Sequence, residues 1–136
     1  MLKFYRLTVI LLGLSLLVAN VGVYRSPLIG STEERQEVLA QLGYLEEQLH
    51  AGLGERMQAL FPEGSAFTHV LYGLAWCGYA RTADDTLSVR YAIAEAEWAY
   101  GQLDSPGVRG LFPSVMVPKY GAFYAGWRNY LLAHII

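Results

Sequence analysis

The chain has only one cysteine, Cys77, among its 136 residues. One cysteine cannot form a disulfide bond within the chain, and it cannot supply the thiolate cluster of a structural zinc site. Cys77 stands between Trp76 and Gly78 in an apolar run, which predicts a buried and unreactive thiol. The sequence therefore excludes a disulfide scaffold and a thiolate zinc cluster.

Charged residues are also scarce, at 16%, whereas hydrophobic residues make up 54% of the chain. Ten basic and twelve acidic residues give a formal net charge of −2, so no excess of positive charge is present to attract nucleic acid. We expect no nucleic-acid partner. The high hydrophobic content indicates a membrane segment together with a well-buried core.

Several familiar patterns are missing from the sequence. It contains no G-x-S-x-G motif, no glycine loop of the phosphate-binding kind and no H-E-x-x-H motif. No stretch alternates strongly enough to predict a sheet, and no segment is of low complexity. The sequence thus favours a protein that is not an enzyme, predicts no cofactor and indicates an all-α fold.

The N-terminal segment 1–24 is predicted to be a membrane anchor. It includes eighteen uncharged residues, "LTVILLGLSLLVANVGVY", which follow Lys3 and Arg6 and approach the roughly 20 residues that a spanning helix needs. A cleaved signal peptide is the alternative, but the poor match to a small-residue cleavage site favours a retained anchor. The positive-inside rule then predicts a single-pass cell-membrane protein with a cytoplasmic N-terminus and an extracytoplasmic domain.

Residues 25–31, "RSPLIGS", are predicted to be a linker, and residues 32–136 to form a helical domain. Ser31 and Glu34 fit the capping box of a first helix. Apolar residues then recur every three or four positions from Val38 to Leu60, which predicts an amphipathic helix. Glycines at 52 and 54 predict a break in that helix.

Three further segments complete the predicted domain. The turn "PEGS", with Ser65 as a cap, leads to a helix that is apolar all round up to Ala80, and "RTADDT" supplies a cap for a helix over 87–103. The segment 104–120 has three prolines and predicts a long loop. A last helix from about residue 121 to 134 follows. The predicted fold is therefore a transmembrane helix and a small bundle of about four helices in antiparallel hairpins.

A carboxylate and an imidazole stand three residues apart at Glu47 and His50, with a further carboxylate at Glu46. This is the E-x-x-H spacing of di-iron bundles, which need two such motifs and two more carboxylates. Neither His69 nor His134 has a glutamate three residues before it. The sequence therefore favours a solvated polar face here and predicts no metal site.

Three other polar residues lie near apolar surface and form a candidate polar site: Glu63, His69 and Glu95. For His69, a core histidine bonded to a carbonyl is favoured over a catalytic base. For Glu95, an exposed helix face is favoured, although its alanine neighbours and the nearby Trp98 make it the most interesting of the carboxylates.

Aromatic residues recur at helical spacing near the C-terminus, and they form the candidate ligand or partner surface: Tyr120, Phe123, Tyr124, Trp127 and Tyr130. Rings of this kind stack on sugars or peptide side chains, and they also fill cores. The sequence favours a core or partner contact over a ligand platform.

Three stretches, "FPEGSAFTHVLYGLAW", "YAIAEAEWAYGQLDSP" and "YGAFYAGWRNYLL", resemble helical hairpins of the α/α-toroid, as in six-hairpin glycosidase-like proteins. The resemblance covers about Phe61 to Leu132 and lies in the order of helices, short turn and long aromatic loop. No catalytic motif of that family transfers to this chain, and a complete toroid has many more helices. The resemblance implies a domain that binds or processes carbohydrate.

Two functions are therefore expected. The first is a membrane-anchored interaction or scaffold protein, an accessory subunit of an envelope or membrane complex, whose partner is another protein. Its basis is the absence of catalytic motifs together with a C-terminal helix that carries more apolar surface than a small domain covers. The alternative is a carbohydrate-binding or glycan-processing domain.

Overall fold

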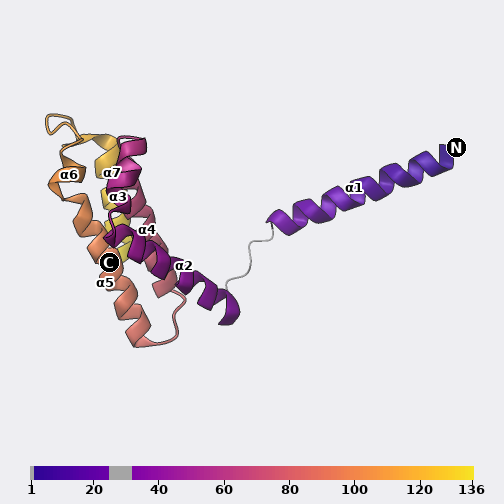
Figure 1. Ribbon diagram of the computed structural model, residues 1–136, viewed down its shortest axis with the longest axis horizontal. Helices are drawn as coiled ribbons and strands as arrows, with labels where there is room; N and C mark the ends of the chain where they lie inside the picture. The colour runs from indigo at the N-terminus through magenta and orange to yellow at the C-terminus, as the bar shows by residue number, and fades with distance from the viewer. Residues whose placement is uncertain (1, 25–31) are drawn as a thin grey trace. The chain divides into compact units, whose positions relative to one another are not determined.

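The structure, a computed structural model, describes residues 2–24 and 32–136, and the side chains of residues 6, 8–18 and 34–136 (Figure 1). Every regular element in these ranges is a helix, which confirms the predicted all-α class. The predicted linker at 25–31 and the capping box at Ser31 lie outside the described residues. The helices are α1 Leu2–Tyr24, α2 Thr32–His50, α3 Leu53–Leu60, α4 Gly64–Ala80, α5 Thr86–Leu103, α6 Pro106–Arg109 and α7 Gly121–Ile135.

The predicted membrane anchor requires a correction. Among the residues that the structure describes, no helix is both long enough and apolar enough to cross a membrane. Crossing a hydrocarbon core of about 30 Å takes roughly 20 consecutive, predominantly apolar helical residues. The predictions of a transmembrane signal anchor, of a single-pass cell-membrane location and of a cytoplasmic N-terminus are therefore wrong.

The chain divides into two units, Met1–Val38 and Leu39–Ile136. The division falls within α2, whereas the sequence placed the start of the domain at residue 32. The second unit contains the C-terminal part of α2 and all of α3 to α7, and it holds every site considered below.

The predicted break after the first domain helix is confirmed, because α2 ends at His50 and α3 begins at Leu53. Gly52 lies between them with a φ of 84°, a left-handed conformation that glycine adopts without steric cost. Its amide donates to the carbonyl of Leu49 at 3.1 Å, which closes the turn.

The start of α4 differs from the prediction. The helix begins at Gly64, with Glu63 before it and no side-chain cap, so the predicted cap at Ser65 is wrong. The reason is the close approach of α3, since a Cβ at position 64 would collide with the carbonyl group of Met57. Glycine therefore marks the point where the two helices touch, and Ser65 lies inside α4.

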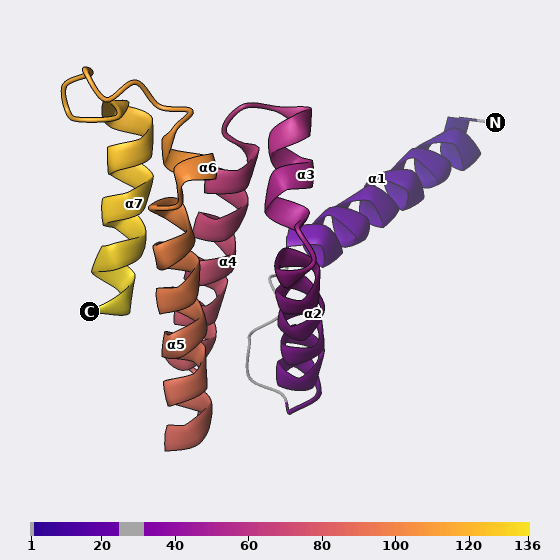
Figure 2. The same cartoon turned by 60° about the vertical axis from the view of Figure 1, so that its left-hand side comes forward.

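Helix α4 lies in the middle of the second unit (Figure 2). It packs against α3 on one side and against α5 and α7 on the other, and α5 also contacts α7. Helices that follow one another in this packing, α3 and α4, α4 and α5, and α5 and α7, run antiparallel, as predicted, whereas α4 and α7 run parallel (Figure 2). Three fully buried side chains lie where α4, α5 and α7 meet: Val70, Leu103 and Leu131.

One glycine and three alanines allow these helices to approach closely. A Cβ at Gly73 of α4 would lie 2.9 Å from Cδ1 of Leu131 and 3.3 Å from Cβ of Ala99. Ala92, Ala96 and Ala99 of α5 have no exposed surface, because α4 packs directly on this small-residue stripe. Cys77 of α4 is also buried, as predicted, and burial raises the pKa of its thiol.

Helix α5 begins where the acidic cap was predicted. The Asp85 carboxylate accepts a 2.8 Å hydrogen bond from the amide of Ser88, which satisfies one of the unpaired amides of the first turn. The predicted loop 104–120 contains the short helix α6, which the sequence analysis missed. Ser105 caps it and Pro106 takes its first position, a position where proline is favoured because no amide is needed there.

Candidate functional site

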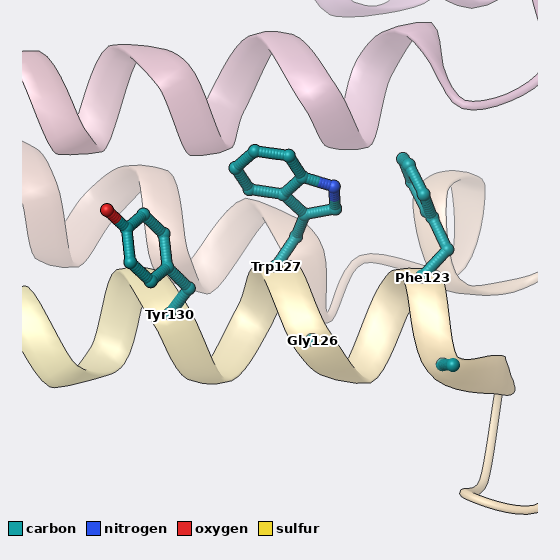
Figure 3. A pocket seen from close by; sticks show the side chains of 5 residues that line it. Phe123, Gly126, Trp127 and Tyr130 are labelled. Carbon is teal, nitrogen blue, oxygen red and sulfur yellow. The ribbon is translucent and has the colours of Figure 1, made fainter.

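One face of α7 carries an open apolar groove, which we call the α7 groove. Its lining residues are Ala122, Phe123, Gly126, Trp127 and Tyr130, and its volume is about 430 Å³. The three aromatic residues follow one another at intervals of four and three along α7, so their side chains project from the same side of the helix (Figure 3). None of the five lining residues is charged.

The rings of the α7 groove are steeply inclined to one another. The Phe123 and Trp127 rings are 6.5 Å apart at 63°, and the Trp127 and Tyr130 rings are 6.0 Å apart at 81°. The Phe67 ring of α4 packs edge to face on the Trp127 indole, with the ring centres 5.4 Å apart and an interplanar angle of 88°. This contact restricts the orientation of the indole. The result is a ridged surface held by edge-to-face contacts, a preferred arrangement of aromatic pairs.

Two lining residues of the groove are small. Ala122 and Gly126 are four residues apart, one turn along the same face, and both are exposed. A Cβ at Gly126 would meet no atom within 4 Å. These two residues were not among the predicted site residues, although their spacing beside the aromatic series is a recognisable signal.

Tyr124, a predicted member of the aromatic surface, instead belongs to the core. It is 5% exposed, and its hydroxyl group donates to the carbonyl of Leu103 at 2.9 Å and to Oδ1 of Asp104 at 3.2 Å. Burial, more than the neighbouring Asp104, raises its pKa. The structure thus separates Tyr124 from the three rings of the α7 groove.

Tyr120 lies outside the groove as well. It directly precedes α7, has a left-handed φ of 69° and meets the Tyr124 ring at 5.5 Å. Lys119 and Arg109 place their cationic groups 5.2 and 5.7 Å from its ring centre. Its surroundings are therefore basic, in contrast to the uncharged groove.

Beside Tyr120, Asp104 joins α5 to α7 through charge. Its carboxylate accepts a 2.8 Å hydrogen bond from Arg128 and lies 3.6 Å from Arg109. The bond from Arg128 is the main reason that the pKa of Asp104 lies below its usual value. The Arg128 guanidinium also lies 4.5 Å from the centre of the Tyr100 ring. Arg128 therefore contacts both Tyr100, in the last turn of α5, and Asp104, which directly follows the helix.

His69 is the core histidine that the sequence favoured. It is 6% exposed, and its Nδ1 lies 2.8 Å from the carbonyl oxygen of Ser65. A carbonyl group only accepts, so this nitrogen carries the proton of the neutral ring. Burial lowers the pKa of His69, which keeps the ring uncharged near neutral pH.

Glu95 lies on α5 and accepts a 2.7 Å hydrogen bond from the hydroxyl group of Tyr72. Tyr72 is 2% exposed, and its pKa is raised first by burial and then by this bond. Glu63 directly precedes α4. Among the described residues, no hydrogen bond joins any two of Glu63, His69 and Glu95, so the three do not form one site.

Glu95 has different neighbours, which come from α2. One ligand atom each from Glu46, His50 and Glu95 lies within 4.8 Å of the others. Tyr91 donates to both oxygens of Glu46, at 2.7 and 2.8 Å. The sequence analysis noted Glu46 and His50 together but could not connect them with Glu95, which is far along the chain.

The function of this arrangement has to be inferred from its geometry. The likeness to α/α-toroid hairpins, which rests on the order of helices and loops, stays a prediction. No protein-family model, curated protein or solved structure matches this chain.

Proposed function

We propose that the Leu39–Ile136 unit is an interaction module that binds an apolar helix of a partner protein in the α7 groove. One observation carries the proposal, namely that a hollow of about 430 Å³ on α7 is lined entirely by uncharged residues. Phe123 and Tyr130 in this lining are 41% and 51% exposed. Contiguous exposed apolar surface of this kind is typical of binding sites, because burying it on a partner is favourable.

The small residues of the groove favour a helix as the bound element. Ala122 and Gly126 leave room for the backbone of another helix to come close, while the rings on the same face can enclose its apolar side chains. Helix-in-groove binding uses this combination of a shallow apolar floor and anchoring pockets. In such a role the protein is an accessory or scaffold subunit of a larger complex.

The geometry favours an apolar partner over a glycan. A sugar ring stacks on an aromatic face and needs polar side chains around it to bond its hydroxyl groups. In the α7 groove the rings of Phe123, Trp127 and Tyr130 meet at 63° and 81°, and the polar side-chain atoms are limited to the indole nitrogen and the phenol hydroxyl. The resemblance to carbohydrate-active hairpins therefore has little support from this surface.

The test is an affinity purification of the full chain from its native source, compared between two glutamate variants. Gly126→Glu places a charge in the groove, whereas Gly101→Glu places the same charge on α5. A Cβ meets no atom within 4 Å at either glycine, and both positions are exposed, so both variants should fold. Circular dichroism checks that their helix contents agree.

We expect a stoichiometric protein partner that is retained by Gly101→Glu and lost from Gly126→Glu. The reason is that an unpaired carboxylate in an apolar contact must lose its hydration on binding. Retention of that partner by both variants would refute the proposed groove. Saturable binding of a glycan by the parent chain that Gly126→Glu abolishes would refute the protein partner and support the alternative.

A further inference from the structure

The contact between α2 and α5 concentrates groups that bind metal ions. Glu46 and His50 are four residues apart on α2 and so lie on one face of the helix, and Glu95 faces them from α5. One ligand atom from each residue lies within 4.8 Å of the other two. Two carboxylates and an imidazole are a common ligand set for divalent transition metals.

Two tyrosine hydroxyl groups hold the carboxylates of this cluster in place. Tyr91 donates to Glu46 at 2.7 and 2.8 Å, and the buried Tyr72 donates to Oε2 of Glu95 at 2.7 Å. A carboxylate oxygen that accepts one hydrogen bond still has a lone pair free for a cation. Partners of this kind orient the ligands in metal sites and are energetically important there.

The negative charge of the cluster has no counterpart among the described ion pairs, none of which includes Glu46 or Glu95. One carboxylate oxygen of Glu46 and one of Glu95 lie within 4.8 Å of each other. Both carboxylates therefore act on the same small volume. Two like charges in such proximity are unfavourable unless a cation lies between them.

A buried indole lies beside the same tyrosines. The indole Nε1 of Trp76 is buried and has no hydrogen-bond partner among the described residues, and Trp76 as a whole is 2% exposed. Its ring lies 5.4 Å from that of Tyr91 and 6.2 Å from that of Tyr72. The indole also interacts with the hydroxyl group of Tyr72, so Trp76 belongs to the network that holds Glu95 in place.

We propose that Glu46, His50 and Glu95 bind a divalent transition-metal ion of the zinc class, with a water molecule as the fourth ligand. Around zinc, ligand atoms at about 2.0–2.2 Å from the ion lie about 3.4 Å from one another. The present spacing reaches this value by side-chain movements on the order of 1 Å.

A metal ion in this position cross-links α2 to α5. It therefore fastens the C-terminal part of α2 to α5. The other contacts between these two helices include the Tyr91–Glu46 hydrogen bond and the packing of the His50 ring on Trp98 at 4.3 Å. The predicted absence of a metal site is replaced by this proposal, which is independent of the α7 groove.

The test is a titration of the metal-free full chain with zinc chloride in competition with a chromogenic chelator. We expect one zinc ion per chain, and Glu46→Gln and Glu95→Gln should each lower the affinity by about tenfold or more. Glutamine keeps the size of the side chain and an acceptor for the tyrosine hydroxyl. The matched control is Glu47→Gln, a change at the exposed neighbour of Glu46 that should leave the affinity unchanged.

A second measurement keeps the result clear if a glutamine variant folds poorly. His50 is exposed, so His50→Gln should fold, and it should weaken binding as much as the glutamate variants do. At the same zinc concentration, the melting temperature of the parent chain and of Glu47→Gln should rise by more than that of His50→Gln. The proposal is overturned if no saturable zinc binding occurs, if Glu47→Gln loses as much affinity as Glu46→Gln, or if magnesium binds more tightly than zinc.

Discussion

The hydroxyl group of Tyr124 donates a 2.9 Å hydrogen bond to the carbonyl oxygen of Leu103, the last residue of α5. The last four carbonyl groups of a helix have no hydrogen-bond partner within it. Leu103 is buried, so water cannot supply the missing donor. A side chain of α7 therefore completes the C-terminus of α5, and the order of α7 and the end of α5 depend on each other.

Tyr124→Phe tests this bond. The variant keeps the ring but leaves a buried carbonyl group without its donor, so we expect the free energy of unfolding to fall by about 1–2 kcal/mol. Urea denaturation measures the change. Tyr130→Phe is the control, since Tyr130 is 51% exposed and should change stability by less than about 0.5 kcal/mol. Equal losses in both variants would show that the bond contributes nothing.

Two glycines of α4 give opposite predictions for the same substitution. Gly73→Ala places a methyl group 2.9 Å from Leu131 Cδ1, and overpacking of this kind should cost about 1–3 kcal/mol. Gly78→Ala meets no atom within 4 Å and should stabilise the helix by up to about 1 kcal/mol. Thermal or urea denaturation of the two variants measures the sign of each change in the free energy of unfolding. A stabilising Gly73→Ala would mean that α7 packs less closely on α4 than the structure shows.

His69 should make the protein less stable in mild acid. Burial keeps the pKa of His69 in the folded state below the ordinary value of about 6.5. Between these two pKa values the unfolded chain is protonated at this histidine and the folded chain is not. Stability is therefore highest above this pH and falls as the pH drops below it. The free energy of unfolding, measured between pH 7.5 and about 5, should decrease in the parent and much less in His69→Gln. A parallel decrease in both proteins would assign the effect to other groups.

The contribution of Asp104 to the free energy of unfolding should change with pH in a more acidic range than that of His69. Its pKa is lowered in the folded state, chiefly by the bond from Arg128, so its contribution is present above the unfolded value of about 3.9 and is lost as the pH falls through the folded value. Asp104→Asn should therefore be less stable than the parent at pH 7, with a gap that narrows below about pH 4. Because the Asp104 side chain is 40% exposed, salt should also narrow the gap. A gap that is independent of pH would contradict the ion pair.

Local signals in the sequence were sufficient for most of the helix boundaries. Gly52 adopts the left-handed turn that a helix break requires, and Asp85, one of three neighbouring residues that could serve, caps α5. Such features depend on a few neighbouring residues. The start of α4 was placed wrongly because Gly64 is needed for contact with α3, a reason that cannot be read from the turn itself.

The candidate sites were less predictable because they depend on which helices meet. Tyr124 and Trp127 are three residues apart and equally aromatic, yet one fills the core and the other lines a surface groove. Helical spacing places both near α4 and α5 but does not give the rotation of α7. Likewise, Glu95 became part of a cluster only through Glu46 and His50 on a different helix.

The middle position of α4 has a consequence for local opening. A helix that contacts α3, α5 and α7 cannot be released unless several of its neighbours leave as well. Amide hydrogens near Val70 and Trp76 should then exchange with solvent only when the whole Leu39–Ile136 unit unfolds, whereas those of α6, a single turn at its edge, should exchange through local fraying. Helix α4 therefore unfolds together with α3, α5 and α7 and not by itself.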